Sequence, residues 1–110
     1  MTKEQLRHYR STRVEISQIK RRIVDLEKLG CEVEVTKPLR DLYRKKLKDL
    51  IEGQVKVEKA IETLNPTERE LVRLRYFDGK EWYKICSVIN YEWAQVHRIH
   101  AQALRKLEKR

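Results

Sequence analysis

The sequence predicts an all-α fold, in which an N-terminal antiparallel helical hairpin precedes a helix-turn-helix unit. Three observations support this. Apolar residues recur at helical spacing along most of the chain, only three Gly and two Pro residues interrupt it, and 39% of its 110 residues are charged. Such a composition is typical of helices that pack along one apolar stripe and expose charge elsewhere. We expect the hairpin to occupy residues 1–64 and the helix-turn-helix unit residues 65–110.

The first expected helix covers residues 2–29, which contain neither Gly nor Pro. From residue 16 onward its apolar positions follow the 3,4 spacing of a coiled-coil seam: Ile16, Ile19, Ile23 and Leu26. Gly30 stands where a helix would end, and residues 31–37 are expected to form a connector. A long helix followed by a short connector would make the first arm of a hairpin.

The second expected helix begins at Pro38, because proline is favoured at the first helical position. Its apolar residues repeat at 4,3 spacing: Tyr43, Leu47, Leu50, Val57, Ile61 and Leu64. Two long helices joined by a short connector should fold back antiparallel, with their seams in contact. The hairpin would then serve as a brace for the helix-turn-helix unit or as a surface for homodimer formation, and the sequence leaves both open.

Three shorter helices are expected after the hairpin. Asn65 is a natural N-cap and Pro66 suits a first turn, so one helix should run from there to about Tyr76 or Phe77. Another covers about residues 82–89, and the last runs from about Glu92 to about Leu107. Its buried side is expected to hold Val96, Ile99, Ala103 and Leu107. A short helix, a tight turn and a longer basic helix form the helix-turn-helix pattern.

The charge balance narrows the class of partner. The net charge is +9 at pH 7, and residues 65–110 hold ten Lys or Arg against six Asp or Glu. A basic surface of this kind suits nucleic acid or an anionic membrane. No apolar run exceeds two residues, which argues against a membrane span or a signal peptide. Cys31 and Cys86 are too few for a disulfide framework, so we expect a cytoplasmic protein with free thiols. Since the apolar runs are short, we expect no membrane partner.

The C-terminal segment opens with "LNPTE", continues with "LRYFDG" and "KICSVIN", and closes with "RIHAQALRKL". In these motifs Leu64–Lys109 resembles region 4 of sigma-70-type transcription factors. With its hairpin and length included, the chain is similar to small sigma-like regulators of Gram-positive phages and prophages. These comprise late-gene activators of the autolysin-regulator type and a related uncharacterised streptococcal phage family. The resemblance implies a transcription regulator that binds double-stranded DNA in a bacterial host cell, and contact with host RNA polymerase, on which region 4 docks.

Two positions near the turn depart from the usual helix-turn-helix sequence. Cys86 replaces a small Ala or Gly, and as a small hydrophobe it is expected to pack between the helices. Asn90 replaces a Gly, and Asn is among the few residues that readily adopt the left-handed conformation. Both substitutions should keep the geometry of the turn.

Five residues at the start of the last helix are expected to read bases. The resemblance puts four of them where region 4 faces the major groove: Trp93, Ala94, His97 and Arg98. Gln95 lies beside them and is expected to read adenine or to bond a phosphate. On a helix capped by Glu92, the first turns offer one face opposite the buried side. Trp93 has an equally good alternative, which is to pack on the preceding helix. Because Trp93 and Ala94 replace the Arg-Glu pair of the housekeeping factor, the standard −35 sequence is not the expected target.

Cations around the helix-turn-helix are expected to contact DNA phosphates, which adds affinity without sequence information. They are Lys80, Lys84, Arg73, Arg105, Lys106 and Lys109, with Lys80 and Lys84 ranked first. For any one of them, a solvated surface charge is an equally good interpretation. Arg75 is considered as an ion-pair partner of Glu68 or Asp78.

His97 and His100 lie one helical turn apart, which raises the question of a metal site or a catalytic pair. No two further metal ligands stand at a recognisable spacing, and no nucleophile, carboxylate pair or phosphate loop accompanies them. We therefore expect no metal, no cofactor and no enzymatic activity. Protonation of both histidines below about pH 6.5 is expected to strengthen DNA binding.

Two other functions fit the same pattern. A phage DNA-packaging protein of the small-terminase type also joins a helix-turn-helix to a helical hairpin, and would form a ring of many subunits. A protein-only adaptor would bind polymerase or a sigma factor without DNA. A complete sigma factor is not expected, because residues 1–63 leave no room for a promoter-melting region. An activator, or half of a split sigma factor, is the expected form.

Overall fold

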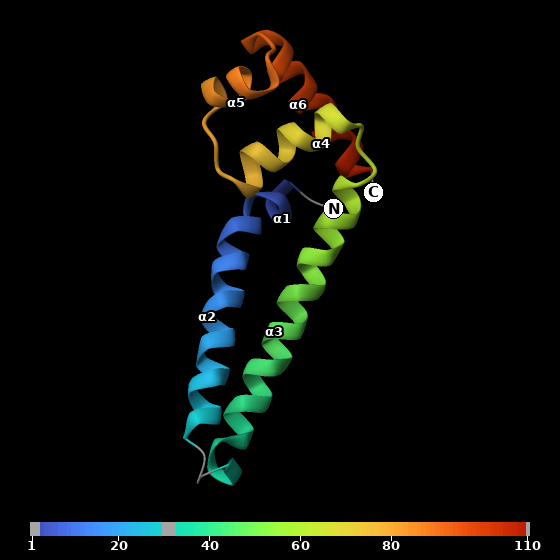
Figure 1. Ribbon diagram of the computed structural model, residues 1–110. Coiled ribbons are helices and arrows are strands. Elements are labelled where there is room, and N and C mark those ends of the chain that lie inside the picture. Colours follow the sequence, from blue (N-terminus) through green and yellow to red (C-terminus); the bar gives the residue numbers. More distant parts are fainter. Residues whose placement is uncertain (1–2, 30–32, 110) are drawn as a thin grey trace. The chain divides into compact units, whose positions relative to one another are not determined.

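The computed structural model describes residues 3–29 and 33–109 (Figure 1). Every regular element in these residues is a helix, which confirms the predicted all-α class. The chain forms two compact units, one of Ser11–Val55 and one of Met1–Arg10 with Lys56–Arg110. They are termed here the helical pair and the C-terminal unit. Across the described residues, no helix combines the length and the apolar character needed to cross a membrane.

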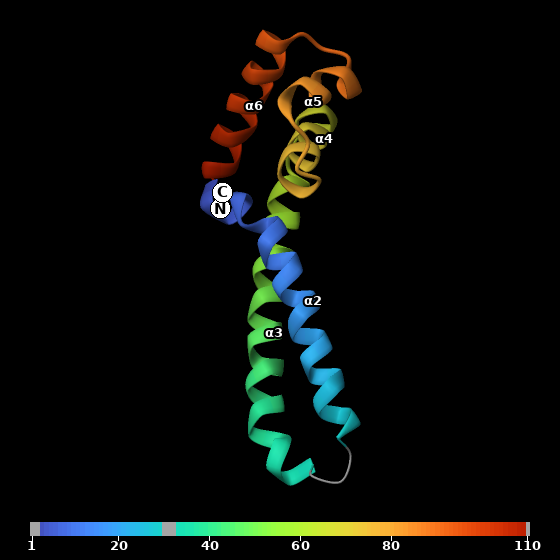
Figure 2. The same cartoon turned by 90° about the vertical axis from the view of Figure 1, so that its left-hand side faces the viewer.

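The helical pair is made of parts of α2 (Tyr9–Lys28) and α3 (Val33–Ile61), which lie side by side and run antiparallel (Figures 1 and 2). On α2, Ile19 and Ile23 are buried at the predicted seam. Three predicted seam residues of α3 are half-buried: Tyr43, Leu47 and Leu50. The apolar stripes read from the sequence are thus the sides on which the two helices meet.

Two ion pairs also join the helices of this unit. Arg44 lies 2.9 Å from Glu27, and Lys46 lies 3.2 Å from Glu15. All four side chains are largely exposed, and exposed pairs of this kind contribute little to stability. Burial of the isoleucines therefore accounts for more of the pairing than the charges do.

The prediction of a single helix over residues 2–29 is wrong. The structure has α1 (Lys3–Arg7), a turn at His8, and then α2. Leu6 on one side of this turn is fully buried, and Tyr9 on the other side is 9% exposed. The sequence here has good helix propensity, but packing of both side chains into the core decides the path of the chain.

The second helix begins earlier than predicted, at Val33. Residues 33–37 of the connector predicted over residues 31–37 are therefore helical, and that prediction is wrong for them. Pro38 lies inside the helix and is exposed. It lacks the N–H that would bond the carbonyl of Glu34, but water can reach that carbonyl near an exposed helix start. The helix end predicted at Gly30, and Cys31, fall outside the described residues.

The same helix ends at Ile61, three residues before the predicted end. Glu62 and Thr63 form a turn, in which the hydroxyl of Thr63 donates to the carbonyl of Ala60 at 2.6 Å. The amide of Leu64 donates to the carbonyl of Ile61 at 3.0 Å, and Leu64 is buried. The turn therefore keeps the predicted apolar position in the core while it releases the chain toward the next helix.

The core of the C-terminal unit draws on both ends of the chain. Its largest cluster contains Leu6, Tyr9, Val57, Ile61, Leu64, Val72, Phe77, Ala103 and Leu107. The ring of Tyr9 stacks on that of Phe77, with centroids 3.7 Å apart, and its hydroxyl donates to Glu58 at 2.6 Å. These contacts attach the start of the chain to the helix-turn-helix region, and α1 contacts α6 directly.

Four helical elements follow Leu64: α4 (Pro66–Val72), the π-helix η1 (Arg73–Phe77), α5 (Trp82–Ile89) and α6 (Trp93–Glu108). The predicted cap at Asn65 is confirmed. Its side chain accepts from the amide of Glu68 at 2.8 Å, and its own amide donates to the Glu68 carboxylate at 3.0 Å. The helix predicted to reach Phe77 does so, but its last five residues widen into a π turn.

Candidate nucleic-acid interface

The turn between α5 and α6 is closed by a left-handed residue. Asn90 has φ 60° and ψ 43°, as expected for an Asn in the place of a Gly. A second apolar cluster holds the two helices against α4: Leu71, Ile85 and Val96 are buried, with Leu74, Trp82, Cys86, Ile89 and Ile99 packed around them. Cys86 thus has the packing position predicted for it. This cluster fixes which side of α6 points away from the protein.

The first two turns of α6 present an exposed face. Glu92 occupies the N-cap position, and Trp93, Ala94, Gln95 and Arg98 are exposed. On the opposite side of the helix, Val96, Ala103 and Leu107 are buried and Ile99 is half-buried, as predicted. Four of the five predicted base-reading residues are therefore open to a partner, and we term these four the α6 reading face.

His97 is the exception among the five. Its ring lies between two indoles, with centroids 4.6 Å from Trp82 and 4.5 Å from Trp93. Its Nε2 is buried and has no hydrogen-bond partner among the described residues. Trp93 itself remains 57% exposed. The side chain that packs on the preceding helix is thus His97, and its ring also contacts that of Trp93.

His100 is also enclosed. The Tyr76 hydroxyl and His100 Nε2 are 2.7 Å apart, and the Trp82 ring meets His100 edge-on. Burial, and then the charges of His97, Lys3 and Arg75, lower the pKa of His100 to about 4. The predicted protonation of both histidines near pH 6.5 is therefore wrong for His100, because a half-buried imidazole among cations resists a further positive charge.

The six predicted phosphate-binding cations divide into two groups. Lys80, Lys84, Arg105 and Lys109 are exposed, and no carboxylate of the described residues pairs with them. Arg73 lies 2.7 Å from Glu62 and 3.8 Å from Glu58. Lys106 lies 2.9 Å from Glu68. Only the first group offers charge that the protein itself does not already neutralise.

Glu62 receives two guanidinium groups. Hydrogen bonds from Arg73 and, next in effect, from Arg69 hold the pKa of Glu62 below its usual range. Arg69 donates to its second oxygen at 2.8 Å. Both arginines therefore link α4 and η1 to the end of α3, a structural role that competes with phosphate binding by Arg73.

Two residues have roles that the sequence did not reveal. Glu68 is only 1% exposed and accepts from Lys106 Nζ at 2.9 Å, so it joins α4 to α6 as well as capping α4. The "NPTE" spacing signals the capping role but not the contact with α6. Arg75 pairs with neither Glu68 nor Asp78, contrary to the expectation. It donates to the carbonyl of Lys80 at 3.0 Å and lies 4.8 Å from the centre of the Trp82 ring.

No group of three or more His, Cys, Asp or Glu residues within residues 3–29 and 33–109 is arranged to hold a metal ion. Comparison of the chain with protein-family models, with curated proteins and with solved structures finds no match.

Proposed function

We propose that the protein is a sequence-specific DNA-binding regulator of transcription, encoded by a phage or prophage and active in the cytoplasm of its bacterial host. The observation that carries the proposal is the α6 reading face: exposed Trp93, Ala94, Gln95 and Arg98 at the start of a helix. Buried Val96 fixes the opposite side of that helix. A helix that exposes polar and aromatic groups at its N-terminal end is what major-groove reading requires.

Each exposed side chain has a chemistry suited to a base edge. The guanidinium of Arg98 can donate two hydrogen bonds to O6 and N7 of a guanine, which is worth about 1–3 kcal/mol of discrimination. Gln95 can bond adenine in the same bidentate way. Trp93 and Ala94 can contact the methyl group of a thymine. In this role the ring of Trp93 remains in contact with that of His97.

The unpaired cations supply affinity that is independent of sequence. Lys80 and Lys84 flank the start of α5, while Arg105 and Lys109 lie at the end of α6. Each phosphate that such a residue neutralises releases condensed counterions, so binding should weaken as salt rises. The resemblance to sigma region 4 adds contact with host RNA polymerase to the proposal, and with it a role in activating promoters.

The test is selection from a randomised duplex pool at near-physiological salt, followed by sequencing of the retained DNA. Arg98→Ala and Arg21→Ala are run in parallel. Both lose one positive charge, but Arg21 is an exposed residue of the helical pair, whereas α6 belongs to the C-terminal unit. The wild type and Arg21→Ala should enrich the same motif, and Arg98→Ala should blur it at one or two positions.

A palindromic motif would support a homodimer that reads two half-sites. Retention without any enriched motif, equal for all three proteins and lost as salt rises, would contradict the proposal. The basic surface would then bind DNA only through its phosphates, without reading the sequence.

A further inference from the structure

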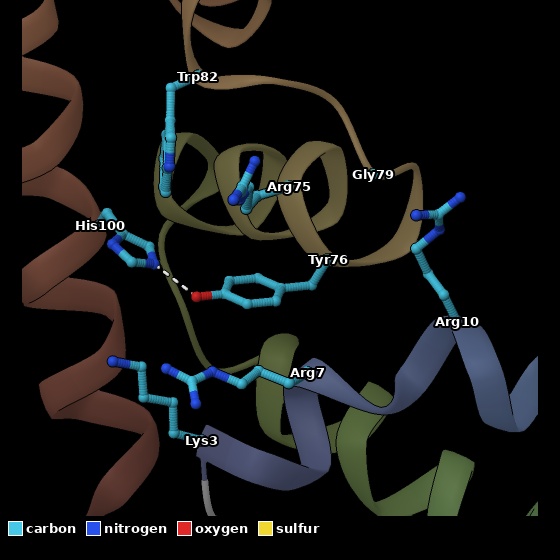
Figure 3. Close-up of a pocket in the computed structure, with 8 residues that line it drawn as sticks. All are labelled: Lys3, Arg7, Arg10, Arg75, Tyr76, Gly79, Trp82 and His100. Carbon is cyan, nitrogen blue, oxygen red and sulfur yellow. Dashed lines mark hydrogen bonds between the residues drawn. The ribbon is translucent and has the colours of Figure 1, made fainter.

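A basic pocket lies within the C-terminal unit (Figure 3), and none of its lining residues belongs to the α6 reading face. Its volume is about 520 Å³. Four cationic side chains line it: Lys3 and Arg7 from α1, Arg10 from the start of α2, and Arg75 from η1. No Asp or Glu belongs to the lining. The pocket thus gathers positive charge from segments that are far apart in the sequence.

The charge in this pocket is not neutralised by the described part of the chain. No carboxylate there pairs with Lys3, Arg7 or Arg10. Arg75 donates to a backbone carbonyl and lies over an indole, and neither contact removes its charge. Other cations of the same unit do meet carboxylates, as Arg73 and Lys106 show. Four unpaired cations in one concave site repel one another and attract a polyanion.

Two of the guanidinium groups lie close against other residues of the pocket lining. Gly79 has φ 71°, and a Cβ at this position would collide with the Arg10 guanidinium. The positive φ favours glycine here, and the absence of a side chain lets the Arg10 guanidinium lie close to the backbone. Opposite, the face of Trp82 carries Arg75. Planar guanidinium groups suit the oxygen atoms of phosphate, which they can bind through two hydrogen bonds at once.

The inner end of the pocket is polar. Figure 3 shows Tyr76 and His100 joined across it by their hydrogen bond, with Lys3 and Arg7 beside them. Lys3 and Arg75 contribute to the lowered pKa of His100, after burial and His97. The positive charge of the pocket therefore helps to lower the pKa of His100, and NMR can follow the protonation of this imidazole.

We propose that this pocket binds a ligand carrying two or more linked phosphate groups. Four cations are more than a single phosphate needs, and the concave shape favours a compact ligand such as the polyphosphate group of a nucleotide. The phosphates of a DNA backbone are the other source of the same chemistry. The proposal does not depend on base reading, because none of the pocket residues belongs to the α6 reading face.

The first measurement is calorimetric titration of the full chain with inorganic pyrophosphate, with sulfate at matched ionic strength as the control anion. We expect one pyrophosphate per chain and clearly weaker binding of sulfate. Arg7→Ala and Arg10→Ala should each weaken pyrophosphate binding by about ten-fold or more, the effect of losing a charged hydrogen-bond donor. Arg21→Ala should change nothing. Both pocket arginines are exposed, and unchanged circular dichroism would confirm that the variants fold.

A second readout reports on the pocket itself. Bound pyrophosphate would offset the cations around His100, so the NMR titration of this imidazole should move up from about pH 4 when the ligand is saturating. The same addition to Arg7→Ala, at a concentration that saturates only the wild type, should leave the titration in place.

DNA binding by the same variants separates the two sources of phosphate. If Arg7→Ala weakens DNA binding more than Arg21→Ala does, and pyrophosphate competes with DNA at constant ionic strength, the pocket holds backbone phosphates. If pyrophosphate binds but DNA affinity is unaffected, the ligand is a soluble polyphosphate. Pyrophosphate binding no tighter than that of sulfate, or weakened equally by Arg7→Ala and Arg21→Ala, would overturn the proposal. If the randomised duplex pool yielded no enriched motif, the proposed base reading would fail, but the measured binding of pyrophosphate would still stand.

Discussion

The buried carboxylate of Glu68 allows a quantitative test of how α6 is held. Its side chain is almost fully buried, and one oxygen accepts both the Asn65 amide at 3.0 Å and the Lys106 ammonium at 2.9 Å. Replacing Glu68 by Ala removes the return bond of the capping box, the link to α6, and the volume of a buried side chain. The cap is worth about 1 kcal/mol and the vacated space about as much again.

The ion pair adds less, because the Lys106 side chain is 48% exposed and water screens it. We therefore expect Glu68→Ala to lower the free energy of unfolding by about 2–3 kcal/mol, or roughly 10 °C in Tm for a domain of this size. Glu68→Gln keeps the shape and an acceptor for the Asn65 amide, so it should cost about 1 kcal/mol.

Thermal and urea unfolding, followed by far-ultraviolet circular dichroism, measure both variants. Glu70→Ala is the matched control, since Glu70 is an exposed acid of the same helix. It should unfold close to the wild type. Equal losses for Glu68→Ala and Glu70→Ala, or equal losses for the Ala and Gln variants of Glu68, would refute this account of the α4–α6 contact.

Three further predictions concern the turn, the acid response and the salt response. Asn90→Ala should lower the free energy of unfolding by about 1 kcal/mol in urea unfolding, and Asn90→Gly should not, because only Gly and Asn accept the left-handed conformation readily. The unfolded chain protonates His100 near pH 6.5 and the folded chain near pH 4, so this residue makes the folded state less stable as the pH falls through that range. His100→Gln should flatten the decline in urea unfolding measured at successive pH values. Lys80→Ala and Lys84→Ala should each lower the slope of log affinity for DNA against log salt by about 0.9 in fluorescence anisotropy, and unchanged slopes would remove them from the interface.

Local signals in the sequence predicted the C-terminal helices well. Asn65 and Pro66 mark the start of α4, and the left-handed Asn90 separates α5 from α6. These features depend on residues within one turn of each other. Two other features depend on more distant parts of the fold. The break at His8 depends on what Leu6 and Tyr9 pack against. The helical start at Val33 depends on solvent access around Pro38. The prediction failed where tertiary contacts override helix propensity.

The candidate interface was predictable to a similar degree. The exposure of Trp93, Gln95 and Arg98 follows from helical periodicity once Val96 is assigned to the core. Helical periodicity does not predict which cations form ion pairs, since nothing in the sequence distinguishes Arg73 from Lys80 in this respect. Only the fold brings Arg73 to the end of α3 and leaves Lys80 exposed. The basic pocket was missed for the same reason, because its side chains come from both ends of the chain.

The most direct test of the central claim pairs one side chain with one base pair. On the duplex enriched by the wild type, each base pair is replaced in turn, and the Kd of the wild type and of Arg98→Ala is measured at fixed salt. We expect Arg98→Ala to lose discrimination at one or two G·C positions, by about 5- to 150-fold each, and to keep it elsewhere. A uniform loss of affinity, with discrimination intact at every position, would contradict base reading by α6.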